Sequence, residues 1–237
     1  MRLINLLIIV IAFTNCSTTK KSNAAMEQKP IFEIAIRKVK QGKEKEFRAA
    51  RSAFIKKLKE QDGIEKDWEF KSFFTMPEPD ETDVFVGMTR YESPEAMQKI
   101  AGQLMQSQEA ANFFSTFDMK SFVAVQPEDG SYFKLEDHIK DGNVLEVAVR
   151  SPKAGMESKF SEARKGFFGL VAQQDGYLFD KEFVDLQSGD KVVLIGWESM
   201  EAFQKALGVL QTKPEMGAFF GMLDVKAYQA LMLSSNE

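Results

Sequence analysis

The chemistry open to this chain is limited by two residue counts. Its 237 residues include one cysteine, Cys16, and one histidine, His138. A zinc site built from cysteine and histidine, a histidine-based catalytic triad and a two-histidine metal site are therefore excluded. The sequence contains no glycine-rich phosphate loop and no carboxylate cluster with metal-ligand spacing. We therefore expect neither a metal ion nor another cofactor.

Two arginines have a spacing that could serve ligand binding. Arg51 follows Phe47 by four residues and precedes Phe54 by three, which places it at the margin of the apolar face of a predicted helix. Arg164 occupies the matching place in a second predicted helix. Such an arginine could bind a phenolate or a carboxylate, or it could reach solvent or pair with a glutamate of its own helix.

Overall composition is that of a folded protein, with 44% hydrophobic and 28% charged residues. Lys and Arg number 31 and Asp and Glu number 35, so the net charge is -4. Because there is no basic excess to neutralise phosphates, we do not expect nucleic acid as a partner.

The N-terminus predicts export. Arg2 precedes an apolar run, Leu3–Phe13, that is too short to cross a bilayer as a helix, which needs about 20 residues. The run ends just before Cys16 and resembles a bacterial lipoprotein signal. Residues 1–15 would then be a signal peptide, Cys16 the acylated first residue and 16–29 a tether. The resemblance also implies the periplasmic face of the outer membrane; the alternative is a secreted protein with a free thiol.

The chain repeats itself. When residues 31–63 are placed over residues 144–176, an offset of 113, 13 of 33 positions are identical. When residues 90–118 are placed over 196–224, an offset of 106, 12 of 29 are identical. The offset falls by seven between these windows, which predicts an exposed insertion in the first copy near residues 75–81. We expect a first repeat over 30–126, a linker over 127–142 and a second repeat over 143–233.

Each copy predicts strand, helix, two strands, helix and strand. Alternating apolar residues indicate strands, and apolar residues at steps of three and four indicate helices. In the first copy the strands are 31–39, 68–74, 84–91 and 121–125, and the helices are 43–61 and 94–117, the second broken near Ser107. In the second copy we expect a helix over 155–171 and strands over 177–186 and 191–197. This order is ferredoxin-like, and two such sheets can pack face to face.

One stretch carries a family resemblance. Residues 197–203, Trp-Glu-Ser-Met-Glu-Ala-Phe, follow the Gln-Asp-Gly that closes the preceding helix and precede Phe219-Phe220. Together with the repeat, this pattern resembles the antibiotic-biosynthesis-monooxygenase-like branch of the dimeric α+β barrel superfamily. The resemblance implies an α+β fold in which both repeats form one intramolecular barrel, so that the protein can be a monomer.

The resemblance also implies candidate site residues. Pockets in this family use Trp, Tyr, Asn and Arg to orient a substrate and stabilise an oxyanion. The matching candidates here are Arg164, Tyr177, Trp197, Phe219, Arg51, Tyr91 and Asn112. Haem-degrading relatives place a histidine on the second helix, where this chain has Ile100 and Ala206. His138 could substitute only from the linker, where an exposed side chain is the alternative.

Two charged pairs recur on the first strand of each copy, Glu33 with Arg37 and Glu146 with Arg150. Residues four apart on a strand are roughly 13 Å apart, so the members of a pair cannot bond to each other. They need partners on neighbouring strands, for example Glu69 or Glu182. We expect a polar barrel interior made of such ion pairs.

Two functions remain open. The first is an exported lipoprotein that binds a small hydrophobic or aromatic ligand. The second is a cofactor-independent monooxygenase acting on an aromatic or polyketide-like substrate. We expect any activity near Arg164 and Trp197 in the second copy, because that copy lacks the insertion. An open pocket there would favour function, and a pocket filled by phenylalanine would favour a structural role.

Overall fold

The computed structural model describes residues 29–78 and 81–233. The predicted signal peptide, Cys16 and most of the tether lie outside these residues. In the first half the elements are β1 (Ile31–Val39), α1 (Glu44–Lys59), β2 (Ile64–Met76), β3 (Val84–Tyr91), α2 (Pro94–Leu104), α3 (Gln108–Phe114) and β4 (Phe117–Pro127). In the second they are β5 (Val144–Pro152), α4 (Glu157–Val171), β6 (Tyr177–Asp185), β7 (Lys191–Trp197), α5 (Met200–Leu210), α6 (Pro214–Gly221) and β8 (Leu223–Met232).

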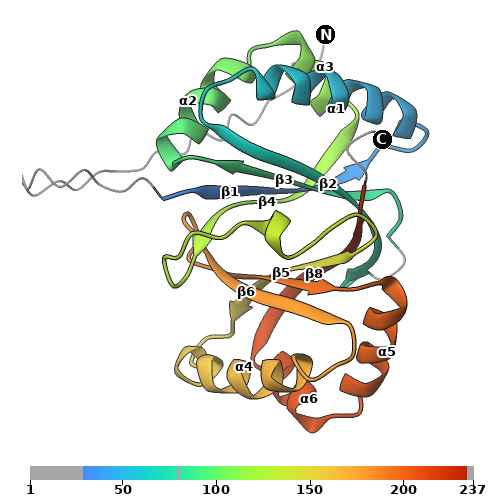
Figure 1. Cartoon of the computed structure of the whole chain (residues 1–237), viewed down its shortest axis with the longest axis vertical. Helices are drawn as coiled ribbons and strands as arrows, with labels where there is room; N and C mark the ends of the chain where they lie inside the picture. Colours follow the sequence, from blue (N-terminus) through green and yellow to red (C-terminus); the bar gives the residue numbers. More distant parts are fainter. Residues whose placement is uncertain (1–28, 79–80, 234–237) are drawn as a thin grey trace, which may run out of the picture.

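Eight antiparallel strands form one closed barrel in the order β1-β3-β2-β8-β5-β7-β6-β4. Each half contributes four strands in the same relative order, and helices cover the outer face of each half, α1–α3 on one side and α4–α6 on the other (Figure 1). The halves join where β2 pairs with β8 and where β4 pairs with β6. The chain is therefore a mixed α/β protein built on an antiparallel barrel.

Serine caps begin three of the helices. Ser93, Ser107 and Ser199 have extended backbones, and each hydroxyl accepts a hydrogen bond of 3.1 Å from the backbone N–H three residues on. These bonds satisfy N–H groups that have no partner within the helix. The predicted break near Ser107 is therefore the start of a separate helix, α3.

The barrel interior is apolar, which corrects the expectation of a polar interior. Phe32, Ile34 and Ile36 of β1 point inward and pack with residues from all eight strands. Because side chains alternate along a strand, Glu33 and Arg37 point outward, beneath the helices. The ion pairs therefore lie between the sheet and the helices.

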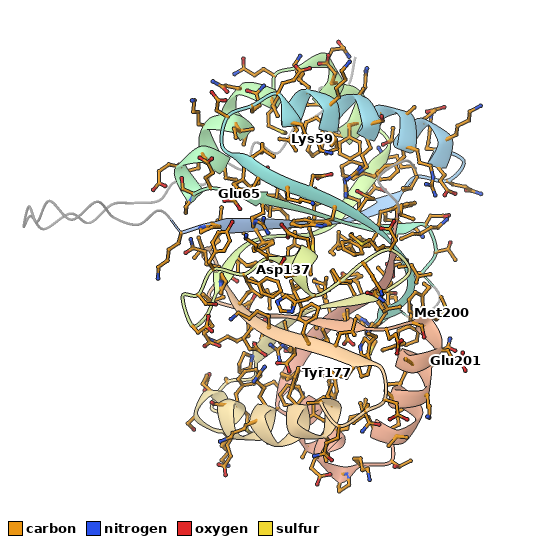
Figure 2. The ribbon with its side chains drawn as sticks, in the orientation of Figure 1. Lys59, Glu65, Asp137, Tyr177, Met200 and Glu201 are labelled. Atoms are coloured by element: carbon orange, nitrogen blue, oxygen red, sulfur yellow. The ribbon has the colours of Figure 1, made fainter. Side chains whose placement is uncertain are left out.

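The connecting segment closes one end of the interior. The predicted linker also contributes to the core, since Phe133, Leu135 and Ile139 are buried in the barrel around a short 3-10 helix, η1 (Leu135–Asp137). Asp137 lies between the two halves in Figure 2. Arg90, on the inward face of β3 opposite Phe32, holds η1 through two hydrogen bonds of 2.9 Å to Glu136.

Each half also reaches into the core of the other. Phe73 and Met76, at the far end of β2, pack against the second half's core, and Phe73 contacts Phe203 of α5 with ring centroids 5.9 Å apart. In the opposite direction Leu186, just after β6, packs against the core beneath α1 and α2. The halves are therefore interlocked by packing as well as by strand pairing.

Candidate functional site

A buried charge network lies between α1 and the strands of the first half. Arg37 of β1 donates to Oε2 of Glu69 at 2.7 Å, and Arg51 of α1 pairs with the same oxygen and, at 2.7 Å, with Asp67. Arg37 can lie flat on β3 because residue 87 is glycine; a Cβ there would be 1.7 Å from Nη2 of Arg37. The predicted cross-strand partner Glu69 is confirmed.

The same network recurs 113 residues later. Arg150 pairs with Glu182, and Arg164 of α4 pairs with Glu182 and, at 2.6 Å, with Asp180. The four first-half members, Arg37, Arg51, Asp67 and Glu69, map one by one onto these residues. Arg51 and Arg164 therefore pair with strand carboxylates, rather than with solvent or with glutamates of their own helices.

A groove of about 310 Å³ lies beside the first network, along α1. Its lining combines apolar side chains with several charges: Phe47, Arg48, Arg51, Ser52, Ile55, Lys56, Lys59, Glu69, Phe85 and Leu233. The apolar members come from α1, β3 and the end of the described chain, while Arg48, Lys56 and Lys59 stand on the solvent side of α1. Figure 2 shows Lys59 on α1 and Tyr177 on the opposite side of the barrel.

The matching space in the second half is filled. Phe168 stands where Ile55 stands in the first half, and the guanidinium of Arg164 lies 4.5 Å from its ring centroid. Phe167 and Phe219 stack with centroids 5.2 Å apart, and Phe160 packs on Phe219 at 5.7 Å. A second hollow of about 130 Å³ lies near Asp175 and Lys205, and Arg164, Tyr177, Trp197 and Phe219 line neither hollow.

The seven sequence candidates thus fall into separate places. Arg51 lines the groove, and Tyr91 is buried beneath α1 and α2, outside it. Asn112 is exposed on α3, where its side chain accepts a hydrogen bond of 2.8 Å from Gln108. The other four pack in the second half. Sequence reasoning missed Ile55, Lys56 and Lys59; comparing them with Phe168, Gly169 and Ala172 at the offset of 113 would have shown that only the first copy combines a smaller side chain with two cations.

Two further carboxylates lie beneath the helices beside aromatic residues. The hydroxyl of Tyr91 donates to Glu33 at 3.0 Å, and burial together with this carboxylate raises the pKa of Tyr91. In the second half, Trp197 takes the place of Tyr91. Its buried indole Nε1 forms no well-aligned hydrogen bond within the described residues, but it lies close enough to Glu146 to affect that carboxyl group. Burial raises the pKa of Glu146 to about 7, against the opposing effects of Gln229, Arg150 and Trp197. Glu146 can therefore exchange a proton near neutral pH.

The residues present do not fit a haem. His138 stacks on Phe133 with ring centroids 5.0 Å apart and packs on Phe179 at 5.1 Å, within the connecting segment. The two helix positions at which the sequence resemblance would place a haem-binding histidine carry Ile100 and Ala206, both buried in packed cores. Across the described residues, no group of three His, Cys, Asp or Glu side chains could hold a metal ion.

Comparison with solved structures places the fold. An anthrone oxidase-like protein matches with a TM-score of 0.59 and 13% identity, over 89% of this chain and 95% of that one. A haem-binding protein from Thermus thermophilus matches with a TM-score of 0.56 and 6% identity, over 88% and 93%. A chlorite dismutase from Candidatus Nitrospira defluvii matches with a TM-score of 0.54 and 11% identity, over 87% and 92%. The chain thus shares its barrel fold with these proteins.

No family model matches the sequence, and no curated protein matches it. Among residues 29–78 and 81–233, we find no helix with the length and apolar character needed to cross a membrane.

Proposed function

We propose that the protein binds a small hydrophobic or aromatic ligand in the groove along α1. The observation that carries this proposal is the contrast between Ile55 and Phe168. The two charge networks are alike, yet one leaves a groove of about 310 Å³ and the other is filled by a phenyl ring. Known small-molecule pockets begin at about 300 Å³ and combine apolar walls with a few polar groups, as this groove does.

The test uses N-phenyl-1-naphthylamine, a neutral aromatic probe whose fluorescence rises in apolar surroundings. We expect the full-length protein to bind it and Ile55→Phe to lose binding at least tenfold, because the larger side chain fills the groove as Phe168 does in the second half. Val209→Phe, at the rim of the smaller hollow, is the matched control and should bind like the wild type. Equal binding by wild type and Ile55→Phe would reject the groove as the site.

The two halves are, in this proposal, tandem copies of one ferredoxin-like βαββαβ unit that together form an intramolecular counterpart of a dimeric barrel. The support is the shared strand order and the charge network that recurs at a constant offset. A monomer follows, because each copy already covers the apolar face of the other.

Export is the second part of the proposal. Its support is the apolar run that ends at the chain's one cysteine, Cys16. Acylation there would anchor the protein to a membrane through lipid, with the barrel at the periplasmic face of the outer membrane.

A cofactor-independent monooxygenase is a second candidate, because Glu146 has the properties of a general base. Its pKa of about 7 suits proton abstraction near neutral pH, and the buried indole Nε1 of Trp197 is a donor beside it on the same side of the sheet. Oxygen uptake with anthrone as substrate tests this candidate. Uptake that Glu146→Gln abolishes and Glu201→Gln retains would favour the enzyme; no uptake would leave the binding function alone.

A further inference from the structure

Glu69 lines the groove, and one of its carboxylate oxygens has no hydrogen-bond partner among the residues that the structure describes. Both Arg37 and Arg51 converge on Oε2 of Glu69, which leaves the buried Oε1 without a hydrogen bond from residues 29–78 and 81–233. The equivalent residue in the second half uses both oxygens, since Arg150 binds Oε2 of Glu182 and Arg164 binds Oε1. Leaving a buried acceptor unpaired is costly, so Oε1 of Glu69 is placed to accept a hydrogen bond from a ligand.

Two cations stand on the solvent side of the same groove. Lys56 and Lys59 are exposed, lie three residues apart on one side of α1, and form no ion pair with any residue that the structure describes. Arg48, by contrast, is already paired with Glu44 at 3.1 Å. The second half has Gly169 and Ala172 at the corresponding positions, so it has no equivalent of these two positive charges.

The unpaired oxygen of Glu69 and the two lysines lie at different positions along the axis of α1. Glu69 is held beside Arg51, and Lys56 and Lys59 follow Arg51 by five and eight residues. At about 1.5 Å per residue, the lysines are roughly 7–12 Å further along the helix axis. Ile55 lies between them and packs with Leu58 in the core beneath α1. A ligand would therefore meet an acceptor, an apolar wall and then two cations.

We infer that the groove selects a hydroxylated carboxylic acid with an aromatic or short hydrocarbon body. Its hydroxyl donates to Oε1 of Glu69, its body lies against Phe47, Ile55 and Phe85, and its carboxylate faces Lys56 and Lys59. This inference rests on the proposed binding function and adds the chemistry of the ligand. A neutral ligand leaves the lysines without a partner, and one without a hydroxyl leaves Glu69 unsatisfied.

Calorimetry with three related probes tests the inference on the full-length protein. 4-Hydroxycinnamate has both groups, cinnamate lacks the hydroxyl, and methyl 4-hydroxycinnamate lacks the charge. We expect 4-hydroxycinnamate to bind at least tenfold more tightly than either of the others. Lys56→Gln with Lys59→Gln should remove the preference over the ester and keep the preference over cinnamate.

The matched control is Lys159→Gln with Lys165→Gln, which removes the same charge from exposed positions on α4 and should leave all three affinities unchanged. Equal affinity for the three probes, still lost in Ile55→Phe, would overturn the inference and leave the groove as a binding site. Probe binding that survives Ile55→Phe would overturn the inference as well, because the probes would then bind elsewhere. Failure of N-phenyl-1-naphthylamine to bind at all would instead count against the proposed function itself.

Discussion

Ile55 and Phe168 occupy the same position in the two halves of the barrel, and the larger groove lies beside Ile55. Each lies on the helix that carries the network arginine, Arg51 or Arg164. The guanidinium carbons of Arg150 and Arg164 lie over the ring of Phe168, 5.6 and 4.5 Å from its centroid. Ile55 has no aromatic ring on which a guanidinium group could stack, and it lines the groove.

We expect substitutions at these two positions to change the free energy of unfolding by different amounts. Phe168→Ile should lower the free energy of unfolding by roughly 1–3 kcal/mol, because it removes buried phenyl contacts and the stacked guanidinium groups. Ile55→Phe should change it by less than about 1.5 kcal/mol, because the added volume enters an existing groove. Urea denaturation measures both. A larger loss in Ile55→Phe than in Phe168→Ile would contradict the comparison.

Breaking the second network should destabilise the protein strongly. Glu182→Gln leaves Arg150 buried beside Arg164 without its carboxylate, and we expect a loss of about 3–5 kcal/mol. The control is Asp175→Asn, whose partner Lys205 is on the surface, and which should melt close to the wild type because an exposed ion pair adds little to stability. Thermal unfolding of the two variants gives the comparison, and similar melting temperatures would argue against a role for the network in stability.

Glu146 should make stability depend on pH. Its pKa rises from 4.5 in the unfolded chain to about 7 in the fold, so the folded state binds the proton more tightly. The contribution of Glu146 to stability is therefore present in full below about pH 4.5 and is lost as the pH rises through about 7. The loss is on the order of 3 kcal/mol.

Glu146→Gln should remove this dependence. Between pH 5 and pH 8, the wild type should lose more free energy of unfolding than the variant, while Glu201→Gln, at an exposed position, should behave like the wild type. Parallel pH profiles for wild type and Glu146→Gln would show that Glu146 does not titrate in this range.

Neither half should fold on its own as a stable monomer. Residues 27–126 alone would expose the inner face of four strands, with Phe32, Ile34 and Phe70, and would lose the plug formed by Phe133 and Leu135. We expect this fragment and residues 143–237 to be unfolded or self-associated, and the intact chain to be monomeric. Sedimentation and circular dichroism test this. Two well-folded monomeric fragments would contradict the interlocked barrel.

Membrane anchoring should depend on Cys16. In cells, the wild type should fractionate with membranes and Cys16→Ala should become soluble, because the acyl chains supply the anchor. Cys16→Ala that stays in the membrane pellet would contradict lipid anchoring.

The strands could be predicted from the local sequence pattern more readily than the site could. The bounds of β1, β3 and β7 match their predictions, because alternation marks them clearly, whereas β2 and β4 extend beyond the predicted ranges. The extra length of β2, including Phe73 and Met76, pairs with β8 and packs on the second half. Only the other half supplies that contact, so a local pattern could not reveal it.

The site depends on side-chain packing, which the spacing of residues along the sequence does not reveal. Arg51 and Arg164 read alike in sequence, and both form the same ion pairs. Whether space remains beside them depends on the size of one neighbour, Ile55 or Phe168, and on where the surrounding rings lie. Aromatic content indicated a pocket in the second half as readily as a filled core. The rings of Phe160, Phe167 and Phe219 pack on one another there, as their counterparts Phe47, Phe54 and Phe113 do in the first half.

The most direct test of the binding groove is to map where a ligand lands. Amide chemical shifts of the isotope-labelled protein, titrated with 4-hydroxycinnamate, report each backbone position separately. Binding in the groove should shift the amides of α1, Glu69, Phe85 and Leu233 and leave those around Phe168 and Trp197 unchanged. Shifts centred on α4–α6, or spread evenly over the surface, would contradict it.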